Sequence, residues 1–268
     1  MSVLRIGRWK AVAAAISAVL VGLTLPTVAA TPASATTTAY DSTYYKNAIG
    51  KTGPSLKSAL HTIISGNQKR ISYDAVWNAL KVTDQDPNNS ANVILLYSGT
   101  SRSKSLNGGD VGDWNREHVW AQSHGNFGTS AGPGTDLHHL RAADVQVNSI
   151  RGNKDFDFGG SAVSGAPGSY TDANSFEPRN ADKGDVARMI LYMAVRYEGD
   201  DAWADLEPNE STSNGSVPWH GRLSVLKQWN EQDPPSAFEE RRNDIIFGTY
   251  QSNRNPFIDH PEWVEAIW

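Results

Sequence analysis

The stretch "DWNREHVWAQSHG" occupies residues 113–125 and lies between two glycine-rich segments, "LNGGDVGD" before it and "GNFGTSAGPGTD" after it. Clusters of glycine and small polar residues predict loops, so a strand is expected to begin near Trp114 and to end before the second loop. In the next segment, "LHHLRAADVQVNSIRGN", Ala143, Val147 and Ile150 recur at the spacing of one helical face. The predicted order is therefore strand, loop, short strand and helix.

The expected helix has a polar stripe, and other segments of the sequence predict further helices and strands. Asp144, Asn148 and Arg151 form a polar stripe beside the apolar face of the expected helix. Other segments with helical spacing or capping motifs are "PSLKSALHTIISG", "SYDAVWNALKV" with Ser72 as its cap, "DKGDVARMILYMAVRYE", "GRLSVLKQWN" and "SAFEERRNDIIFGTY". The segment "NVILLYSG" predicts a buried strand, "NKDFDFGG" an edge strand or extended turn, and "DQDPNNSAN" a loop. The predicted fold class is α+β, mixed and helix-rich.

The first residues predict an exported protein. A basic start precedes an apolar run of 15 residues and then a small-x-small motif that ends at Ala35. A membrane span needs about 20 apolar residues, so a removed signal peptide over residues 1–35 is favoured over an anchor. We therefore expect a secreted, extracellular chain in which residues 36–268 form a single domain.

Composition narrows the class of this domain. Removing the signal peptide leaves 233 residues and lowers the formal net charge from −5 to −8, which counts against a general polyanion binder. The chain has no cysteine, which excludes disulfides, cysteine nucleophiles and cysteine zinc ligands. We expect a monomer that is stabilised by packing alone and has no membrane partner.

Three residues combine two hard oxygens with an imidazole. The Glu117 carboxylate and the Asn148 amide oxygen suit Mg²⁺ or Mn²⁺ better than zinc, and two protein ligands are enough for a Mg²⁺ ion that keeps its waters. His118 titrates near neutral pH as an ordinary imidazole, so it is the candidate general base for an attacking water. Arg151, one helical turn beyond Asn148, could hold a phosphate and so take part in catalysis.

The adjacent pair Glu117 and His118 raises a geometric problem. Neighbouring residues of a regular strand point to opposite faces, so a bulge, a twist or a strand end is needed before both can serve one pocket. The two side chains need not share one face of the strand, because the base and the metal act on opposite sides of one phosphorus atom.

Four motifs resemble the secreted and periplasmic bacterial endonuclease I family, which carries the His-Me finger, or ββα-metal, nuclease site. They are "NREHVWAQSHG", "DLHHLRAADVQVNSIRGNKDFDFGG", "FEPRNADKGDVARMILYMAVRY" and "QSNRNPFIDHPEWV". The similarity covers roughly residues 72–268. It implies a central ββα-metal core at about residues 113–155 and a single nuclease domain over residues 36–268.

The resemblance also implies residue roles and a reaction. The family's general base matches His118, and its metal-binding glutamate and asparagine match Glu117 and Asn148. The implied reaction is hydrolysis of phosphodiester bonds in DNA, and often in RNA, with one Mg²⁺ or Mn²⁺ ion per site. Little sequence preference and 5′-phosphate ends are expected.

The chain departs from the family pattern in two ways. Some relatives are rich in disulfides, whereas this chain has no cysteine. Some also carry a phosphate-binding arginine between the first strand and the "DLH" motif, where this chain has neither Arg nor Lys. Arg116 and Arg151 are the candidates for substrate binding, although no motif matches either one.

Alternative interpretations stay open at this point. His138 and His139 compete for the base role, because another branch of the site architecture reads "DRGH", but packing beside the site is favoured. His124 is interpreted as a loop hydrogen-bonder. The alternative functions are a zinc hydrolase built on these three histidines and a non-catalytic exported binder of nucleic acid or cell-wall polymer. A structural Ca²⁺ is disfavoured because no segment matches the full spacing of a calcium loop.

Overall fold

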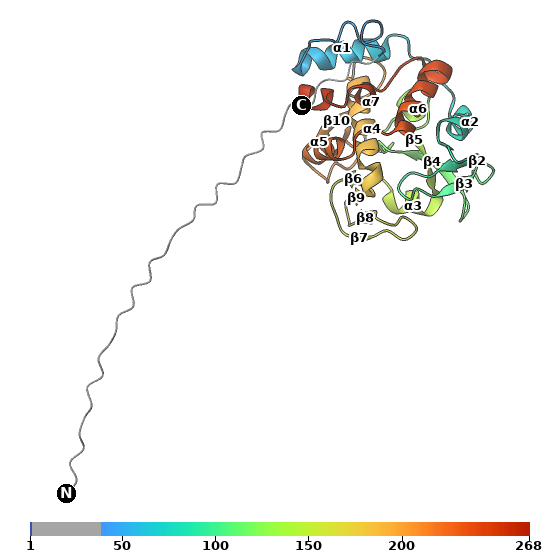
Figure 1. Ribbon diagram of the computed structural model, residues 1–268, viewed down its shortest axis with the longest axis vertical. Helices are drawn as coiled ribbons and strands as arrows, with labels where there is room; N and C mark the ends of the chain where they lie inside the picture. Colours follow the sequence, from blue (N-terminus) through green and yellow to red (C-terminus); the bar gives the residue numbers. More distant parts are fainter. Residues whose placement is uncertain (2–38) are drawn as a thin grey trace. The chain divides into compact units, whose positions relative to one another are not determined.

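The computed structural model describes Met1 and residues 39–268. Residues 2–35 of the predicted signal peptide lie outside this part of the chain. Across the described residues, no helix combines the length and the apolar character that crossing a bilayer requires. Helices and small sheets alternate along the chain (Figure 1), which confirms the mixed α+β class.

The helices match most of the segments with helical periodicity. Within the described residues they are α1 (Gly53–Ser65), α2 (Tyr73–Thr83), α3 (Val145–Arg151), α4 (Lys183–Arg196), α5 (Leu223–Gln232), α6 (Ala237–Ile245), α7 (Pro256–Asp259) and α8 (Trp263–Ile267). Ser72 caps α2 as predicted, and its side chain accepts a hydrogen bond from the backbone N–H of Ala75 at 3.2 Å. Short 3₁₀ turns lie at Pro133–Thr135 and Asn180–Asp182, and a π-helical turn at Ile246–Gln251 extends α6.

The strands form small, separate sheets in the described part of the chain. An antiparallel sheet contains β1 (Gln85–Asp86), β2 (Asn89–Ile94) and β3 (Ser101–Ser103), and β4 (Trp114–His118) pairs with β5 (Leu140–Asp144). A third sheet has the order β6 (Asp155–Phe156), β9 (Ser175–Glu177), β8 (Tyr170–Thr171) and β7 (Ser161–Ala162). The parallel pair β10 (Glu207–Asn209) and β11 (Trp219–Arg222) lies beside β6.

Helix α4 is the central element of the core, and every one of its residues is buried. Helices α1, α5 and α7 pack against it (Figure 1). The helical spacing of apolar residues predicted this helix, and the structure buries its polar residues as well. This is possible because buried charges are paired: Arg188 lies 2.7 Å from the carboxylate of Glu239 on α6.

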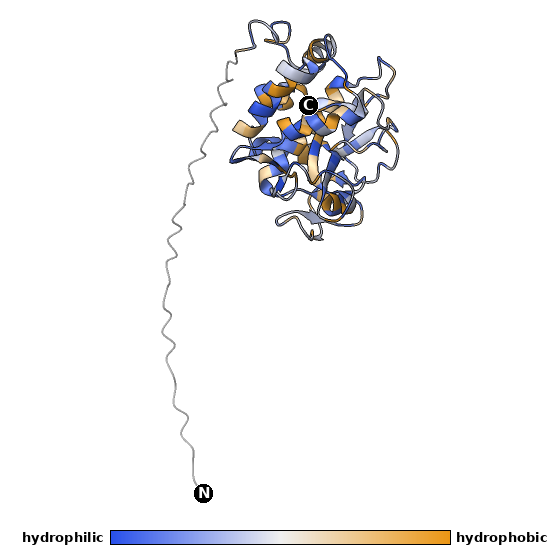
Figure 2. Ribbon diagram, turned by 90° about the vertical axis from the view of Figure 1, so that its right-hand side faces the viewer, coloured by the Kyte–Doolittle hydropathy of each residue, from blue (hydrophilic) through white to orange (hydrophobic). Residues whose placement is uncertain are grey.

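Two apolar clusters flank strand β4. The larger cluster surrounds α4, and the smaller one lies between α2 and β5. Figure 2 shows apolar and polar residues alternating along individual helices, as expected where each helix buries one face. Strand β4 begins in the smaller cluster at Trp114, and the chain enters the larger cluster at Val119 and Trp120. Glu117 and His118 therefore lie at the junction of the two clusters.

The unit formed by β4, β5 and α3 confirms the predicted order of strand, loop, strand and helix. The strands pair in antiparallel register from Trp114 opposite Asp144 to His118 opposite Leu140, and α3 follows β5 directly. The expected helix was wrong at its start, because Asp144 belongs to β5. Its side chain caps α3 by accepting hydrogen bonds from the N–H groups of the next turn, at 2.8 and 3.1 Å.

The segment 84–92 was expected to be a loop and instead forms a hairpin of β1 and β2. The side chain of Asp86 accepts a hydrogen bond from the N–H of Asn88 at 2.8 Å, which closes a tight turn. The polar residues therefore cover an exposed hairpin rather than an irregular loop. The strand expected over residues 92–99 starts earlier, at Asn89, and ends at Ile94.

Candidate active site

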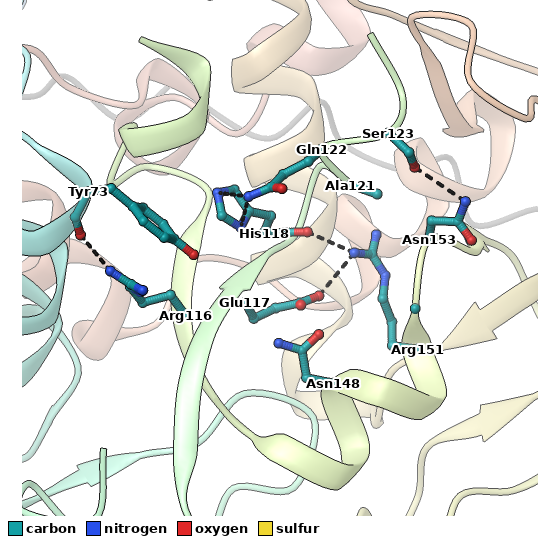
Figure 3. A pocket seen from close by; sticks show the side chains of 11 residues that line it. Tyr73, Arg116, Glu117, His118, Ala121, Gln122, Ser123, Asn148, Arg151 and Asn153 are labelled. Carbon is teal, nitrogen blue, oxygen red and sulfur yellow. Dashed lines mark hydrogen bonds and ion pairs between the residues drawn. The ribbon is translucent and has the colours of Figure 1, made fainter. Parts of the chain in front are cut away.

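A cavity of about 310 Å³ opens where strand β4 ends (Figure 3). Its walls come from the start of α2, from β4 and the turn after it, and from the end of α3. The lining residues are Tyr73, Arg116, Glu117, His118, Ala121, Gln122, Ser123, Asn148, Arg151, Gly152 and Asn153. The structure thus brings all five sequence-predicted site residues, Arg116, Glu117, His118, Asn148 and Arg151, to one cavity.

The end of β4 resolves the problem of the adjacent pair. The backbone carbonyls of His118 and Val119 both accept hydrogen bonds from the guanidinium of Arg151, at 2.7 and 2.5 Å. Consecutive carbonyls of a regular strand point in opposite directions, so a shared partner requires the extended strand to stop here. Of the conditions considered from the sequence, a strand end is the one that lets Glu117 and His118 face the same cavity.

The Glu117 carboxylate is buried and held by two donors. Its Oε1 accepts hydrogen bonds from the hydroxyl of Tyr97 at 2.7 Å and from Nη1 of Arg151 at 3.1 Å. Burial raises the pKa of Glu117, while the charge of Arg151 and the Tyr97 hydrogen bond act in the opposite direction. Both bonds use Oε1, so Oε2 takes no part in them.

Asn148 presents an oxygen to this carboxylate. Its Nδ2 donates to Oδ1 of Asn115 on β4 at 2.7 Å, which fixes the orientation of the amide. In Figure 3 the amide oxygen of Asn148 points toward the carboxylate of Glu117. Two oxygens that are both hydrogen-bond acceptors face each other here, and a hard cation is the partner that satisfies such a pair.

The protonation state of His118 follows from its neighbours. Its Nε2 lies 3.0 Å from the carbonyl oxygen of Gly134, which can only accept, so we assign the proton to Nε2 and the lone pair to Nδ1. The side-chain nitrogen of Gln122 lies 3.1 Å from Nδ1 and 3.0 Å from Nε2. An atom equally distant from both nitrogens lies over the ring face rather than along a lone pair, so Nδ1 stays available to accept a proton.

The expectation that His118 titrates near neutral pH is wrong. Burial, reinforced by the nearby His139, lowers the pKa of His118 to about 3. The side chain is only 7% exposed, because it lies at the junction of the two apolar clusters. His118 is therefore neutral, the form that a general base needs, throughout the neutral pH range.

Arg151 is 1% exposed, and each of its two Nη atoms donates two hydrogen bonds inside the protein. Nη1 donates to Glu117 and to the carbonyl of His118, and Nη2 donates to the carbonyl of Val119 and to Nε2 of His220 at 2.7 Å. Only Nε has no partner. Direct phosphate binding by Arg151 remains a sequence-based prediction, and these contacts count against it because no Nη proton is free.

Arg116 is placed differently. Its guanidinium carbon lies 3.5 Å from the ring centroid of Tyr73 and 4.1 Å from that of Trp77, and Nη1 donates to the carbonyl of Tyr73 at 2.7 Å. Stacking on aromatic rings fixes the plane of the guanidinium without using its remaining N–H groups. Arg116 therefore presents a preoriented positive charge at the edge of the cavity.

The competing histidines pack beside the cavity, as predicted. His139 lies with its ring centroid 5.6 Å from that of His118, and its Nε2 lies 2.6 Å from the carbonyl oxygen of Pro133. His138 is buried with its Nε2 3.1 Å from the carbonyl oxygen of Asn253. Neither residue lines the cavity.

His124 is confirmed as a loop hydrogen-bonder. Its ring nitrogens lie 2.5 Å from the carbonyl oxygen of Trp219 and 2.8 Å from that of Asn153. In the described part of the chain, the structure groups His124 with Asp155 and His220, and the ligand atoms of these three lie within 4.8 Å of one another. The sequence offered no signal for this cluster, because its members lie on three distant segments.

The geometry of this cluster does not favour a metal centre. The rings of His124 and His220 stack with centroids 4.5 Å apart and an angle of 15°, so their in-plane lone pairs run parallel instead of converging. Both nitrogens of His124 already face carbonyl oxygens, and Nε2 of His220 accepts from Arg151. The assignment of a cation to Glu117 and Asn148 stays a prediction.

Comparison with known proteins now decides the family. The family model for endonuclease I matches residues 52–262. The chain belongs to the endonuclease I family. It is 68% identical to an extracellular ribonuclease of Bacillus amyloliquefaciens and 67% identical to one of Bacillus subtilis (strain 168). Each similarity extends over 226 residues, which is 84% of this chain and 78% of the relative. This endonuclease I family member is thus a nuclease, a phosphodiester hydrolase.

Proposed function

We propose that this nuclease hydrolyses phosphodiester bonds of RNA and DNA at the cavity beside β4, with His118 as the general base and a divalent cation bound by Glu117 and Asn148. The observation that carries the proposal is the meeting of an oxygen pair and a neutral imidazole, whose Nδ1 is available, in one cavity. The name of the two Bacillus relatives supports RNA as a substrate. The motif resemblance supports DNA.

The donor set fits Mg²⁺ or Mn²⁺. One carboxylate and one neutral amide oxygen leave coordination positions for waters and for substrate phosphate, which is how Mg²⁺ is usually bound. Burial raises the pKa of Glu117 because it disfavours the charged form of the carboxylate. A nearby positive charge would stabilise that charged form. When bound, the cation supplies charge that stabilises the phosphorus centre and the departing oxygen.

His118 moves the proton. Its Nδ1 takes a proton from water, the water oxygen forms a bond to phosphorus, and the bond from phosphorus to the 3′-oxygen breaks. The departing 3′-oxygen takes a proton from solvent, and the phosphate stays on the 5′ side. The hydrogen bond from Nε2 to the carbonyl of Gly134 fixes the ring during the transfer and stabilises the imidazolium that forms.

Arg116 is the residue that we assign to phosphate binding. Its guanidinium is held against Tyr73 at the cavity edge, so a phosphate can be bound with little loss of side-chain freedom. Among the described residues that line the cavity, Tyr73 is the one aromatic side chain besides the imidazole of His118, and it already stacks on Arg116. The lining therefore favours contacts to the nucleic-acid backbone over base recognition, which agrees with little sequence preference.

The word "extracellular" in the names of the relatives supports export. A signal peptide over residues 1–35, a single nuclease domain over residues 36–268 and action as a monomer complete the proposal. The ββα unit of β4, β5 and α3 supports a His-Me finger core at about residues 113–155.

The proposal is tested with plasmid DNA and structured RNA, each with Mg²⁺ and with EDTA. His118→Ala should lower the initial rate on both substrates by roughly 10²-fold to 10⁴-fold, the usual contribution of a general base. His61→Ala, a histidine on α1 outside the cavity, is the matched control and should act like the parent. A parent rate in His118→Ala would refute the assignment of the base.

The same digestion separates the alternative functions. A non-catalytic binder would retard DNA on a gel and leave it intact with Mg²⁺ as well as with EDTA. A zinc hydrolase would lose activity with a zinc-selective chelator in the presence of excess Mg²⁺. The products also report the chemistry: water attack on RNA leaves 5′-phosphates, whereas attack by the 2′-hydroxyl leaves 2′,3′-cyclic phosphates, and mass spectrometry distinguishes them.

A further inference from the structure

We propose that His220 and Asp155 are positioning residues for the metal-binding carboxylate of Glu117, and that they act through Arg151. The inference rests on the proposed function, since it concerns how the cation site is held. The four side chains form a continuous chain of hydrogen bonds from β6 and β11 to the end of β4. Neither His220 nor Asp155 lines the cavity.

In this series of hydrogen bonds, the donor and the acceptor of each bond can be assigned. Arginine can only donate, so Nε2 of His220, which lies 2.7 Å from Nη2 of Arg151, must accept. The proton of the neutral imidazole is therefore on Nδ1, and it is donated to Oδ1 of Asp155 at 3.0 Å. Burial lowers the pKa of His220 to about 3, which agrees with a neutral ring.

Asp155 ends this series of hydrogen bonds and is itself held by further donors. Its Oδ1 also accepts hydrogen bonds from Nδ2 of Asn214 at 2.9 Å and from the N–H of Gly221 at 2.7 Å. Burial acts to raise the pKa of Asp155, but the hydrogen bonds from His220, Gly221 and Asn214 outweigh it and lower this pKa to about 2, so the carboxylate is charged at neutral pH. A charged acceptor gives the His220 hydrogen bond more strength than a neutral one would.

The ring of His220 has no room to reorient. It is 0% exposed and nearly parallel to two neighbouring rings, Phe156 with a centroid distance of 5.4 Å and His124 with one of 4.5 Å. Trp120 contacts it edge-on, with centroids 5.4 Å apart. Such packing makes the Nε2 lone pair a fixed acceptor for Arg151.

The consequence is at Glu117. Arg151 uses Nη1 for the carboxylate and Nη2 for His220, so fixing one side of the rigid guanidinium fixes the other. Without an acceptor at residue 220, one N–H of Arg151 is buried and unsatisfied, and the guanidinium is expected to shift. Partners of metal-binding carboxylates typically change metal affinity by about 10-fold to 100-fold when they are replaced.

The test compares His220→Leu with His220→Gln. Leucine removes the acceptor, whereas the glutamine oxygen can reach the position of Nε2 and accept from Arg151. Phe257→Leu, a buried core change outside the cavity, controls for a general loss of stability. The readout is the dissociation constant of Mn²⁺ alone, measured calorimetrically without nucleic acid, together with the Mn²⁺ concentration that gives half the maximal rate.

His220→Leu should weaken Mn²⁺ binding by roughly 10-fold to 100-fold and raise the half-saturating concentration by the same factor. His220→Gln should stay within a few-fold of the parent, and Phe257→Leu should bind Mn²⁺ as the parent does. Unchanged Mn²⁺ affinity in folded His220→Leu overturns the inference. If His220→Leu does not fold, Asp155→Asn replaces it, with weaker Mn²⁺ binding expected and parental affinity again overturning the inference.

Glu117→Gln distinguishes this inference from the proposed function. If Glu117→Gln loses Mn²⁺ binding while His220→Leu keeps it, only the positioning role is wrong. If Glu117→Gln binds Mn²⁺ as tightly as the parent, the cation site itself is wrong, and the positioning role falls with it.

Discussion

Tyr97→Phe is a minimal test of how Glu117 is held. The Tyr97 hydroxyl donates to Oε1 of Glu117 over 2.7 Å, and both side chains are buried. Burial raises the pKa of Tyr97 well above its usual value, so the hydroxyl stays protonated and remains a donor. The change deletes one oxygen, leaves the ring in place and keeps Arg151 as the second donor.

The expected loss follows from the type of bond. A hydrogen bond to a charged group contributes about 1.5–3 kcal/mol to the free energy of unfolding. For a domain of this size, a loss of 1 kcal/mol lowers the Tm by about 2–4 °C, so Tyr97→Phe should melt about 3–12 °C below the parent. The less firmly held carboxylate should also bind Mn²⁺ roughly 10-fold more weakly.

Tyr45→Phe is the matched control. The Tyr45 hydroxyl donates to Oδ2 of Asp259 at 2.6 Å, also from a buried ring, but outside the cavity. Thermal melting should show a similar fall for both variants, whereas calorimetry should show weaker Mn²⁺ binding for Tyr97→Phe alone. Parental Tm and parental Mn²⁺ affinity in Tyr97→Phe would refute the reasoning about Glu117.

Three further outcomes are expected. Arg116→Ala should raise KM for DNA more than it lowers kcat, because Arg116 is assigned to phosphate binding; steady-state kinetics that show only a lower kcat would contradict this. Asn148→Ala should require roughly 10-fold more Mg²⁺ for half-maximal activity, whereas Asn148→Asp, which keeps the oxygen, should not. Burial disfavours the charged form of His260, but its hydrogen bonds to Glu262 and Asp41 outweigh this and raise its pKa. The stabilisation by His260 is thus fully present below pH 6.5 and is lost as the pH rises through the raised pKa. The difference in unfolding free energy between the parent and His260→Gln should therefore become smaller as the pH rises.

Local patterns predicted the ββα unit and the residues at its cavity. Helical spacing in the segment after "DLHHL" and the glycine-rich loops on either side of β4 predicted its elements in order. The motif resemblance placed Glu117, His118 and Asn148 at one site, and all three line one cavity. These features depend on residues close in sequence, which is why they could be read without a structure.

Features that depend on distant segments were not predicted. Arg151 lines the cavity, but its Nη atoms are bonded to partners that include His220, 69 positions away, and no sequence pattern indicated that contact. Tyr97 follows β2, and nothing in "NVILLYSG" indicates that its hydroxyl meets Glu117. The low pKa of His118 comes from burial between two apolar clusters, and burial of that kind is set by tertiary packing.

The most direct test of the central claim is a crystal of the parent protein soaked with Mn²⁺, examined by anomalous scattering. We expect one peak between the carboxylate of Glu117 and the amide oxygen of Asn148, within roughly 2.0–2.4 Å of both, as for a hard cation bound by oxygen. A peak at His124, Asp155 and His220 instead, with none between Glu117 and Asn148, would contradict the claim.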